Sequence, residues 1–395
     1  MLQRRRFYLF SSTILVQSCQ CLSRFIDYKL YHQCVSKGGV VDVNGERGSK
    51  NRDRGECDFR LYKSRGQHLL TSTRVLDAIV KKSNIKATDT VLEIGPGTGN
   101  LTLRLLEAAE NVVAVEIDLR MAEALVKRVA DCGLEDRLTL IREDALKTEY
   151  PKFDLVVANI PYNISSPLIA KLLFGTSSFR GATLLLQKEF AHRLLANPGD
   201  SEFNRLAVNV KLVADVEHIM DVSKRDFFPV PKVDSSVVII RPKVNIPSVD
   251  LSEWCAFMRT CFCKKNKTLG ATFKQKRQLI ELMRISTLME SKDNTSAFQD
   301  DFTVIDDNED VKDDHGIVND ADPSRLLYSA MGKTLFKEKV VGILKSSGFE
   351  DKRPSKLSVE GLLHLLSLFN QNKIFFHDKG GKGSNDVELA ASFEL

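Results

Sequence analysis

The sequence predicts an α/β protein built on a doubly wound sheet, followed by a smaller, mostly helical domain. Three observations support this prediction: a β-prone run that ends in three closely spaced glycines, a buried run that ends in an acid, and a later buried run that ends in Asn-Ile-Pro-Tyr. Apolar residues recur at helical spacing after the glycines. Strand, glycine turn, helix and strand in this order are the unit of doubly wound sheets. With 395 residues, the chain is long enough for this domain and a second one.

The first strand is expected at residues 90–94, where it runs into Gly95-Pro-Gly-Thr-Gly99. Glycine has no Cβ, so Gly95 and Gly97 allow the backbone to approach a ligand closely. The second strand, at 112–115, ends at Glu116, where a carboxylate can accept hydrogen bonds from both hydroxyls of a ribose. These features predict a nucleotide-binding unit.

A dehydrogenase is the obvious competitor for this pattern. Its fingerprint has the spacing GxGxxG, and the third glycine helps to seat a pyrophosphate at the helix N-terminus. Here the spacing is GxGxG, and Asn100 stands where that last glycine would be. A ligand without a pyrophosphate fits better, and Glu93 matches the acidic position of methyltransferase motif I.

The third strand, at 138–141, is followed by Asp144. Ligands of open α/β folds bind at the carboxyl edge of the sheet, so the Asp144 carboxylate could accept a hydrogen bond from the exocyclic amine of an adenine. A helix N-cap or turn role is the alternative for this residue.

The fourth strand, at 153–158, delivers Asn159-Ile160-Pro161-Tyr162 to the same edge. An adenine amino nitrogen is a poor nucleophile because its lone pair is delocalised into the ring. If the Asn159 side-chain oxygen and the Ile160 carbonyl accept its two hydrogens, the lone pair is turned toward a methyl donor. Pro161 fixes the turn, and Tyr162 offers a face for the base to stack on.

This chemistry needs no general base and no metal, because the amine loses its proton after the methyl group arrives. The alternative for Asn159–Tyr162 is an ordinary turn at the end of a strand. Its place on the fourth strand of a unit whose first strand ends in three glycines favours the binding role.

Together these motifs resemble the ribosomal RNA adenine dimethyltransferases. The resemblance covers about residues 62–276 and a looser C-terminal part. The matching segments follow in the family's order: Lys63–Leu70, Glu93–Gly99, Glu116, Asp144, Asn159–Pro167, Phe227–Val237 and Phe262–Leu269.

The resemblance implies the Rossmann-like fold of class I methyltransferases and S-adenosylmethionine as cofactor. It also implies N6,N6-dimethylation of two adjacent adenines in the 3′-terminal hairpin loop of small-subunit ribosomal RNA, whose unpaired bases can be flipped into a pocket cheaply. By position, the cofactor-binding residues are His68, Leu70, Glu93, Gly95, Gly97, Glu116, Asp144 and Asn159. The catalytic residues are Asn159, Ile160, Pro161, Tyr162 and Phe227.

Some of these assignments have plainer alternatives. His68 could be a surface or core histidine, and Phe227, expected as a second stacking face, could be a core aromatic. Within the family, the alternative function is that of the mitochondrial transcription-factor branch. Outside enzymes, it is a ribosome-assembly factor whose catalysis is dispensable.

The second domain is expected at about 244–376, after a methyltransferase domain at about 60–243. Lys264, Lys265 and Lys267 lie in a basic stretch with interleaved phenylalanines and are expected to contact RNA phosphates, a solvated helix face being the alternative. An acidic insertion follows at about 290–322, then helical apolar spacing at 324–349 and 357–369, and a loose tail at 377–395.

The net charge of +5 is only a weak indication of a polyanionic partner. None of the eight cysteines forms a CxxC pair and no histidine spacing completes a zinc pattern, so we expect reduced thiols and no metal. No apolar run approaches the roughly 20 residues of a membrane-spanning helix. We expect a monomer.

Residues 1–26 are rich in arginine and serine and contain no acid, as is typical of organellar transit peptides. A linker is expected at 37–54, so that residues 1–59 serve as transit peptide and linker. A mitochondrial location is favoured. The alternatives are plastid, nucleus or nucleolus, secretion, and a disordered tail that has no targeting role.

Overall fold

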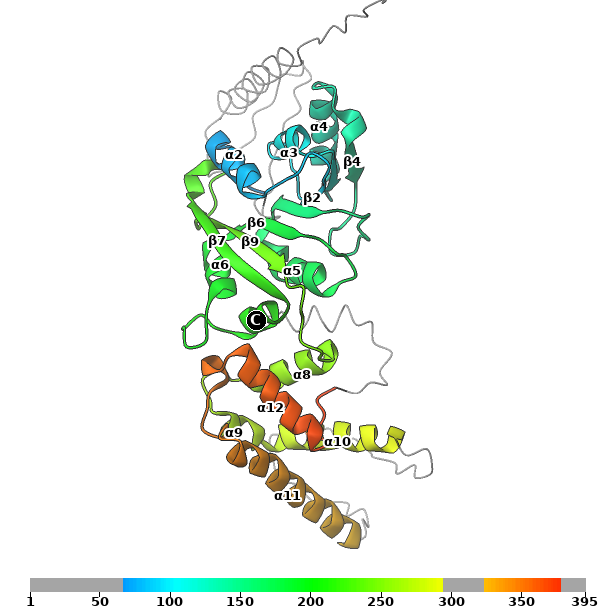
Figure 1. The fold of residues 1–395 in the computed structure, drawn as a ribbon, viewed down its shortest axis with the longest axis vertical. Coiled ribbons are helices and arrows are strands. Elements are labelled where there is room, and N and C mark those ends of the chain that lie inside the picture. The colour runs from blue at the N-terminus through cyan, green and yellow to red at the C-terminus, as the bar shows by residue number, and fades with distance from the viewer. Residues whose placement is uncertain (1–66, 294–322, 378–395) are drawn as a thin grey trace, which may run out of the picture. The chain divides into compact units, whose positions relative to one another are not determined.

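The computed structural model describes residues 67–293 and 323–377, which belong to one compact unit within Arg60–Leu395 (Figure 1). The expected transit peptide and linker, the acidic insertion from residue 294, and the tail beyond His377 lie outside the described residues.

A seven-stranded mixed sheet has the strand order β4-β3-β2-β5-β6-β9-β7. The bounds are β2 (Thr90–Ile94), β3 (Asn111–Val115), β4 (Leu138–Ile141), β5 (Leu155–Asn159), β6 (Gly181–Gln187), β7 (Ala214–Val222) and β9 (Ser235–Pro242). The first five strands in this order are parallel, whereas β9 pairs antiparallel with both β6 and β7. The predicted doubly wound α/β class is confirmed.

The central strands read as continuous apolar runs because helices cover both faces of the sheet. Alternate residues enter two different hydrophobic clusters: Val91 and Val112 join one, and Leu92 and Val113 join the other. The cluster of Val91 contains residues of α2 (Thr73–Lys82), α3 (Thr102–Ala108) and α4 (Leu119–Ala130). That of Leu92 contains residues of α5 (Ser165–Phe174), α6 (Lys188–Leu195) and α7 (Arg205–Val213).

The strand order reverses between β2 and β5. From β2 the chain moves outward through β3 to β4, and then crosses back to place β5 on the other side of β2. Ligands of open α/β sheets bind in the crevice at such a reversal, beyond the carboxyl ends of the strands. The segments that follow these two strands are the glycine turn and Asn159–Tyr162.

Two short strands form a separate antiparallel ribbon, β1 (Leu69–Leu70) with β8 (Phe227–Phe228). In its register Leu69 lies opposite Phe228, and Leu70 lies opposite Phe227. The ribbon joins the segment before the sheet to the segment before β9. Two predicted motifs that are far apart in sequence are therefore neighbours.

The C-terminal part of the described chain is helical. Its helices are α8 (Leu251–Phe262), α9 (Leu269–Phe273), α10 (Lys276–Asp293), α11 (Pro323–Ser346) and α12 (Val359–Gln371). The Trp254 ring is fully buried, and its Nε1 donates to Asn209 Oδ1 on α7 at 3.1 Å. Buried residues of these helices belong to the same cluster as those of α5–α7, so the two parts share a core.

Candidate functional site

The turn after β2 packs against the turn after β5. Gly95 has a φ of +67°, a left-handed conformation that glycine adopts without the steric cost of a Cβ. A Cβ at Gly95 would lie 3.2 Å from Pro161 Cδ. The predicted cofactor turn and the predicted base-binding turn are therefore in direct contact, as their strand positions led us to expect.

Gly97 also has a positive φ, +57°, and a Cβ there would lie 2.8 Å from Leu69 Cδ2. The backbone N–H of Gly97 donates to Glu116 Oε2 at 3.2 Å, and that of Asp118 donates to Oε1 at 2.9 Å. The glycine turn and the end of β3 are thus joined through the Glu116 carboxylate. Burial raises the pKa of Glu116, and the backbone donors oppose that shift.

Glu93 lies at the end of β2 and is fully buried. Desolvation, assisted by the charge of Glu116, raises the pKa of Glu93 to about 8, against the opposing effect of the neighbouring Thr102 hydroxyl. Its Oε2 has no hydrogen-bond partner among the described residues. At neutral pH this carboxyl is therefore mostly protonated, and it places no full negative charge beneath the glycine turn.

Asn159 reaches back to the segment before β1. Its Nδ2 donates to the backbone carbonyl of His68 at 3.2 Å, so the side-chain oxygen is the atom left to accept a hydrogen bond. Ile160 is buried, and Pro161 contacts the glycine turn. The amide is therefore held by a contact between segments 91 positions apart.

Tyr162 stacks against His68, with ring centroids 6.0 Å apart and an interplanar angle of 27°. The Tyr162 hydroxyl hydrogen-bonds to Ser235 Oγ at 2.8 Å, and His68 Nδ1 lies 2.7 Å from the carbonyl oxygen of Pro229. Burial raises the pKa of Tyr162. Four segments of the chain thus fix the two rings beside Asn159.

Leu70 and Phe227 do not face an open crevice in this structure. They lie opposite each other in the β1–β8 ribbon and enter one hydrophobic cluster, with exposed fractions of 3% and 2%. The neighbouring Phe228 is 44% exposed. The stacking face predicted for Phe227 is thus closed off in this conformation, because the ribbon's alternation turns Phe227 inward and Phe228 outward.

Asp144 is half-buried after β4, where its Oδ1 accepts a hydrogen bond from the N–H of Leu146 at 2.9 Å. Asp144 therefore stabilises a turn, which is the alternative role given above. Its second carboxylate oxygen remains available to a ligand. The two roles are compatible.

Lys264, Lys265 and Lys267 lie in the turn between α8 and α9 rather than on a helix. Lys264 and Lys267 are exposed, whereas Lys265 is half-buried and its Nζ donates to the Ser201 carbonyl at 3.0 Å. The exposed pair can reach a phosphate directly.

The sequence does not predict three contributors to the site. Asn100 replaces a glycine of the dehydrogenase fingerprint, and its Nδ2 donates to the Leu70 carbonyl at 2.9 Å. Ser235 and Pro229 lie in a segment that the resemblance identified, but no residue pattern links them to Tyr162 or His68. Such pairings depend on the three-dimensional register of β8 and β9.

Among residues 67–293 and 323–377, no group of three potential metal ligands occurs. In the same part of the chain no helix is long and apolar enough to cross a membrane.

Comparisons with known proteins agree with this geometry. A family profile described as "Ribosomal RNA adenine dimethylase" matches residues 58–299. The chain is 62% identical over 322 residues to the "Ribosomal RNA small subunit methyltransferase, mitochondrial" of Arabidopsis thaliana, covering 80% of this chain and 81% of that protein. It is 41% identical to the "Dimethyladenosine transferase" of Saccharomyces cerevisiae, covering 80% and 91%.

Among solved structures, the fold matches a dimethyladenosine transferase from Plasmodium falciparum with a TM-score of 0.64 and 36% identity. The match covers 78% of this chain and all of that one. The fold class and the resemblance inferred from the sequence motifs are both confirmed. The chain belongs to the ribosomal RNA adenine dimethylase family of methyltransferases.

Proposed function

We propose that the chain transfers methyl groups from S-adenosylmethionine to the N6 atoms of two adjacent adenines in the 3′-terminal hairpin loop of small-subunit ribosomal RNA. The observation that carries this proposal is the contact between Gly95 and Pro161, which brings a nucleoside-binding turn against Asn159–Tyr162. Relatives named as small-subunit ribosomal RNA methyltransferases and dimethyladenosine transferases support the substrate.

The residues around the glycine turn fit S-adenosylmethionine. Gly95 and Gly97 have positive φ angles, and a Cβ at either position would press on Pro161 or Leu69, so glycine is needed for the turn to lie this close to the neighbouring segments. We assign the ribose hydroxyls to the Glu116 carboxylate and the adenine amine to Asp144, because these residues follow β3 and β4 at the carboxyl edge of the sheet. Glu93 keeps a buried oxygen that has no partner among the described residues, and the His68 ring, just before the ribbon, stacks on Tyr162. The Leu70 side chain is buried in the ribbon, so the cofactor contact predicted for it finds no support in this conformation. When bound, S-adenosylmethionine supplies a methyl group on a positively charged sulfur.

In the proposed mechanism, the Asn159 side-chain oxygen and the Ile160 carbonyl accept the two hydrogens of the adenine amine. This arrangement holds the nitrogen and exposes its lone pair, so the chain contributes mainly positioning and electrostatics. The Tyr162 ring provides the stacking face, and its bond to Ser235 and stack on His68 keep it in place. The nitrogen loses one proton for each methyl group that it gains, and no side chain has to remove it first.

We further propose that residues 60–243 form the methyltransferase domain and that 244–376 form a domain that grips RNA, with Lys264, Lys265 and Lys267 contacting phosphates. The chain acts as a monomer. It works in the mitochondrion, and residues 1–59 serve as transit peptide and linker. The mitochondrial name of the Arabidopsis relative supports this location. A reporter fused to residues 1–60 tests it, since diffuse cytosolic fluorescence would refute a transit peptide.

The test of the reaction uses the full chain, labelled S-adenosylmethionine and small ribosomal subunits from a strain that lacks the modification. We expect label in N6,N6-dimethyladenosine after digestion of the RNA, and none with Asn159→Ala. If a bacterial relative labels these subunits and this chain does not, the enzymatic proposal fails. Full complementation of a null mutant by Asn159→Ala would instead indicate a binding factor.

A further inference from the structure

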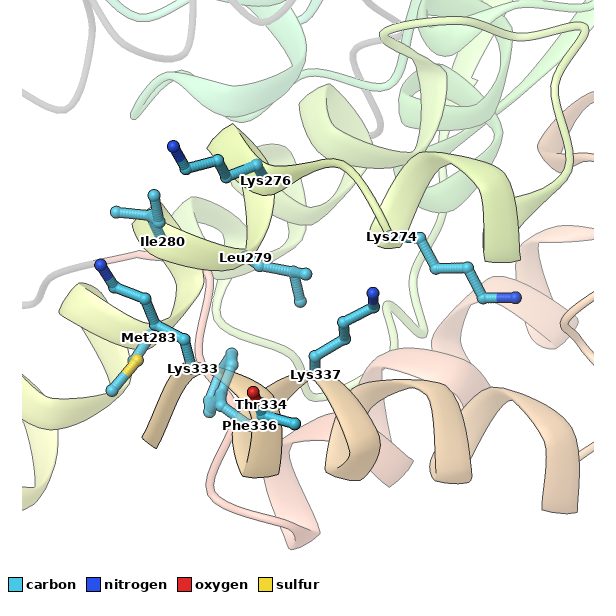
Figure 2. Close-up of a pocket in the computed structure, with 9 residues that line it drawn as sticks. All are labelled: Lys274, Lys276, Leu279, Ile280, Met283, Lys333, Thr334, Phe336 and Lys337. Atoms are coloured by element: carbon cyan, nitrogen blue, oxygen red, sulfur yellow. The ribbon is translucent and has the colours of Figure 1, made fainter. Parts of the chain in front are cut away.

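A cavity lies between α10 and α11, in the helical part of the chain (Figure 2). Its volume is about 200 Å³. The lining combines four lysines with an apolar floor, and the residues are Lys274, Lys276, Leu279, Ile280, Met283, Lys333, Thr334, Phe336 and Lys337. None of these residues belongs to the proposed methyl-transfer site.

The sequence periodicity explains why the two helices face each other here. Lys276, Ile280 and Met283 recur at helical spacing on α10, and Lys333 and Lys337 are four residues apart on α11. The helices approach closely at Gly332, where a Cβ would lie 3.4 Å from Met283 Cε. Figure 2 shows Lys276 and Lys333 on one side of Leu279, and Lys337 and Lys274 on the other side.

The cavity has an excess of positive charge. Lys274 Nζ is paired with Glu350 Oε1 at 2.6 Å, and Glu281 on α10 is paired with Arg284 at 2.8 Å. No carboxylate in the described chain lies within ion-pair distance of Lys276, Lys333 or Lys337, and all three are exposed. Lysines four residues apart on one helix repel each other, so a bound anion would relieve the repulsion.

The volume of the cavity and the apolar residues at its floor indicate which kind of anion it can bind. The cavity is smaller than the roughly 300–1,000 Å³ that enclose a drug-sized ligand. Phe336 and Met283 are half-buried at its floor, and Ile280 is 40% exposed. Lysines around a rim and an aromatic ring beneath are the combination that binds the phosphate and base of an unpaired nucleotide. The exposed Lys264 and Lys267, already proposed to contact phosphates, belong to the same helical part.

We infer that this lysine cavity is a second RNA-binding site, which holds one unpaired nucleotide of ribosomal RNA while the adenine target occupies the methyl-transfer site. Lys276, Lys333 and Lys337 neutralise backbone phosphates, and the apolar floor receives the ribose or base. The inference rests on the proposed function for the identity of the RNA. It assigns the site to substrate docking, separate from the chemistry.

The first test measures RNA binding without methyl transfer. A variant with Lys276→Gln, Lys333→Gln and Lys337→Gln is compared with the wild-type chain for binding to a small-subunit ribosomal RNA transcript. Three lost phosphate contacts should lower the affinity about 100-fold at 0.1 M salt, and reduce the log–log salt slope by about 2. With small subunits as substrate, KM should rise and kcat should stay at the wild-type value.

The matched control changes the same charge in the same helical part. The control variant carries Lys339→Gln, Lys345→Gln and Lys373→Gln. These three lysines are exposed and do not line the cavity. An equal loss of affinity in this control would overturn the inference, as would wild-type affinity in the cavity variant. The latter is also the result expected if an acidic protein segment, rather than RNA, occupies the cavity.

A second measurement needs no variant. Acetylation of lysines in the wild-type chain, read by mass spectrometry, should fall at least about fivefold at Lys276, Lys333 and Lys337 when RNA is bound. Lys339 and Lys345 should react as before. Absence of protection at the cavity would refute the inference. A chain that binds RNA with this protection, yet transfers no methyl group, would refute the proposed reaction and support the second site.

Discussion

The side-chain amide of Asn159 donates a hydrogen bond to the backbone carbonyl of His68 at 3.2 Å, which ties the end of β5 to the segment before β1. This bond determines which atom of the Asn159 amide remains available to the substrate. With Nδ2 engaged, the oxygen is left to accept a hydrogen from the substrate amine. Because this acceptor acts as the nitrogen becomes nucleophilic, its loss should affect kcat more than RNA binding.

We therefore expect Asn159→Ala to lower kcat for methyl transfer by about 10²–10³, the usual effect of removing one preorganised polar partner. Unfolding free energy should fall by only about 1 kcal/mol, since one hydrogen bond is lost. Asn111→Ala is the matched control, because Asn111 lies at the opposite, amino end of a strand. Similar losses of kcat in both variants would contradict the role of Asn159.

Two substitutions at Tyr162 distinguish the contribution of its ring stacking from that of its hydroxyl hydrogen bond. Tyr162→Phe keeps the ring that stacks on His68 but loses the bond to Ser235, so kcat/KM should fall less than about tenfold. Tyr162→Ala also loses the base-stacking face, which is worth about 1–3 kcal/mol. With one RNA substrate, kcat/KM should therefore be highest for the wild-type chain, lower for Tyr162→Phe and lowest for Tyr162→Ala.

Ser235→Ala provides the control for that series. It removes the same hydrogen bond from the other side, so Ser235→Ala and Tyr162→Phe should be equivalent and the double variant should cost no more than either one. Fully additive losses in the double variant would show that the bond does not act through Tyr162.

The sequence predicted the parts of this site better than their connections. The strand end at Ile94 was predicted, and the end at Asn159 was predicted one residue early, because buried parallel strands are continuous apolar runs that glycine or Asn-containing turns terminate. The stack of His68 on Tyr162 could not be predicted from the sequence, because it depends on how the β1–β8 ribbon and β9 place distant segments. The exposure of Phe227 was unpredictable for the same reason: a shift of one residue in the ribbon would exchange it with Phe228.

The lysine cavity shows a further limit of sequence reasoning. Lys276 follows the predicted basic stretch of Lys264–Lys267 in the sequence, but Lys333 and Lys337 lie beyond the acidic insertion. Only the packing of α10 against α11 brings them together.

Gly95 tests the contact between the two turns. Alanine at a positive φ costs roughly 1–2 kcal/mol of backbone energy, and at Gly95 its Cβ would also press on Pro161 at 3.2 Å. Gly133→Ala is a close control, since Gly133 has a similar φ of +64° and nothing lies within 4 Å of the added Cβ. Both variants should lose the backbone energy, and Gly95→Ala should lose more unfolding free energy because of the contact with Pro161. Only Gly95→Ala should lose most of its methyl transfer. Normal activity in Gly95→Ala would mean that the turns can move apart without consequence.

The buried carboxyl of Glu93 predicts a pH dependence of stability. Burial raises its folded-state pKa to about 8 from an ordinary value of 4.5. Between these values the folded chain keeps a proton that the unfolded chain releases, so this group lowers the unfolding free energy as pH rises from about 4.5 to 8. The slope reaches at most about 1.4 kcal/mol per pH unit, and it vanishes outside this window.

Glu93→Gln cannot titrate and should lack this contribution. The stability of the variant relative to the wild-type chain should therefore increase from pH 5 to pH 8, as measured by urea unfolding. Glu123→Gln, an exposed substitution on α4, should run parallel to the wild type over the same range. Comparing differences between chains is essential, because the raised pKa of Glu116 also makes the stability of the wild-type chain fall as pH rises. If the difference between Glu93→Gln and the wild type stays constant with pH, the Glu93 carboxyl is ionised in the folded chain and the glycine turn lies over a full negative charge.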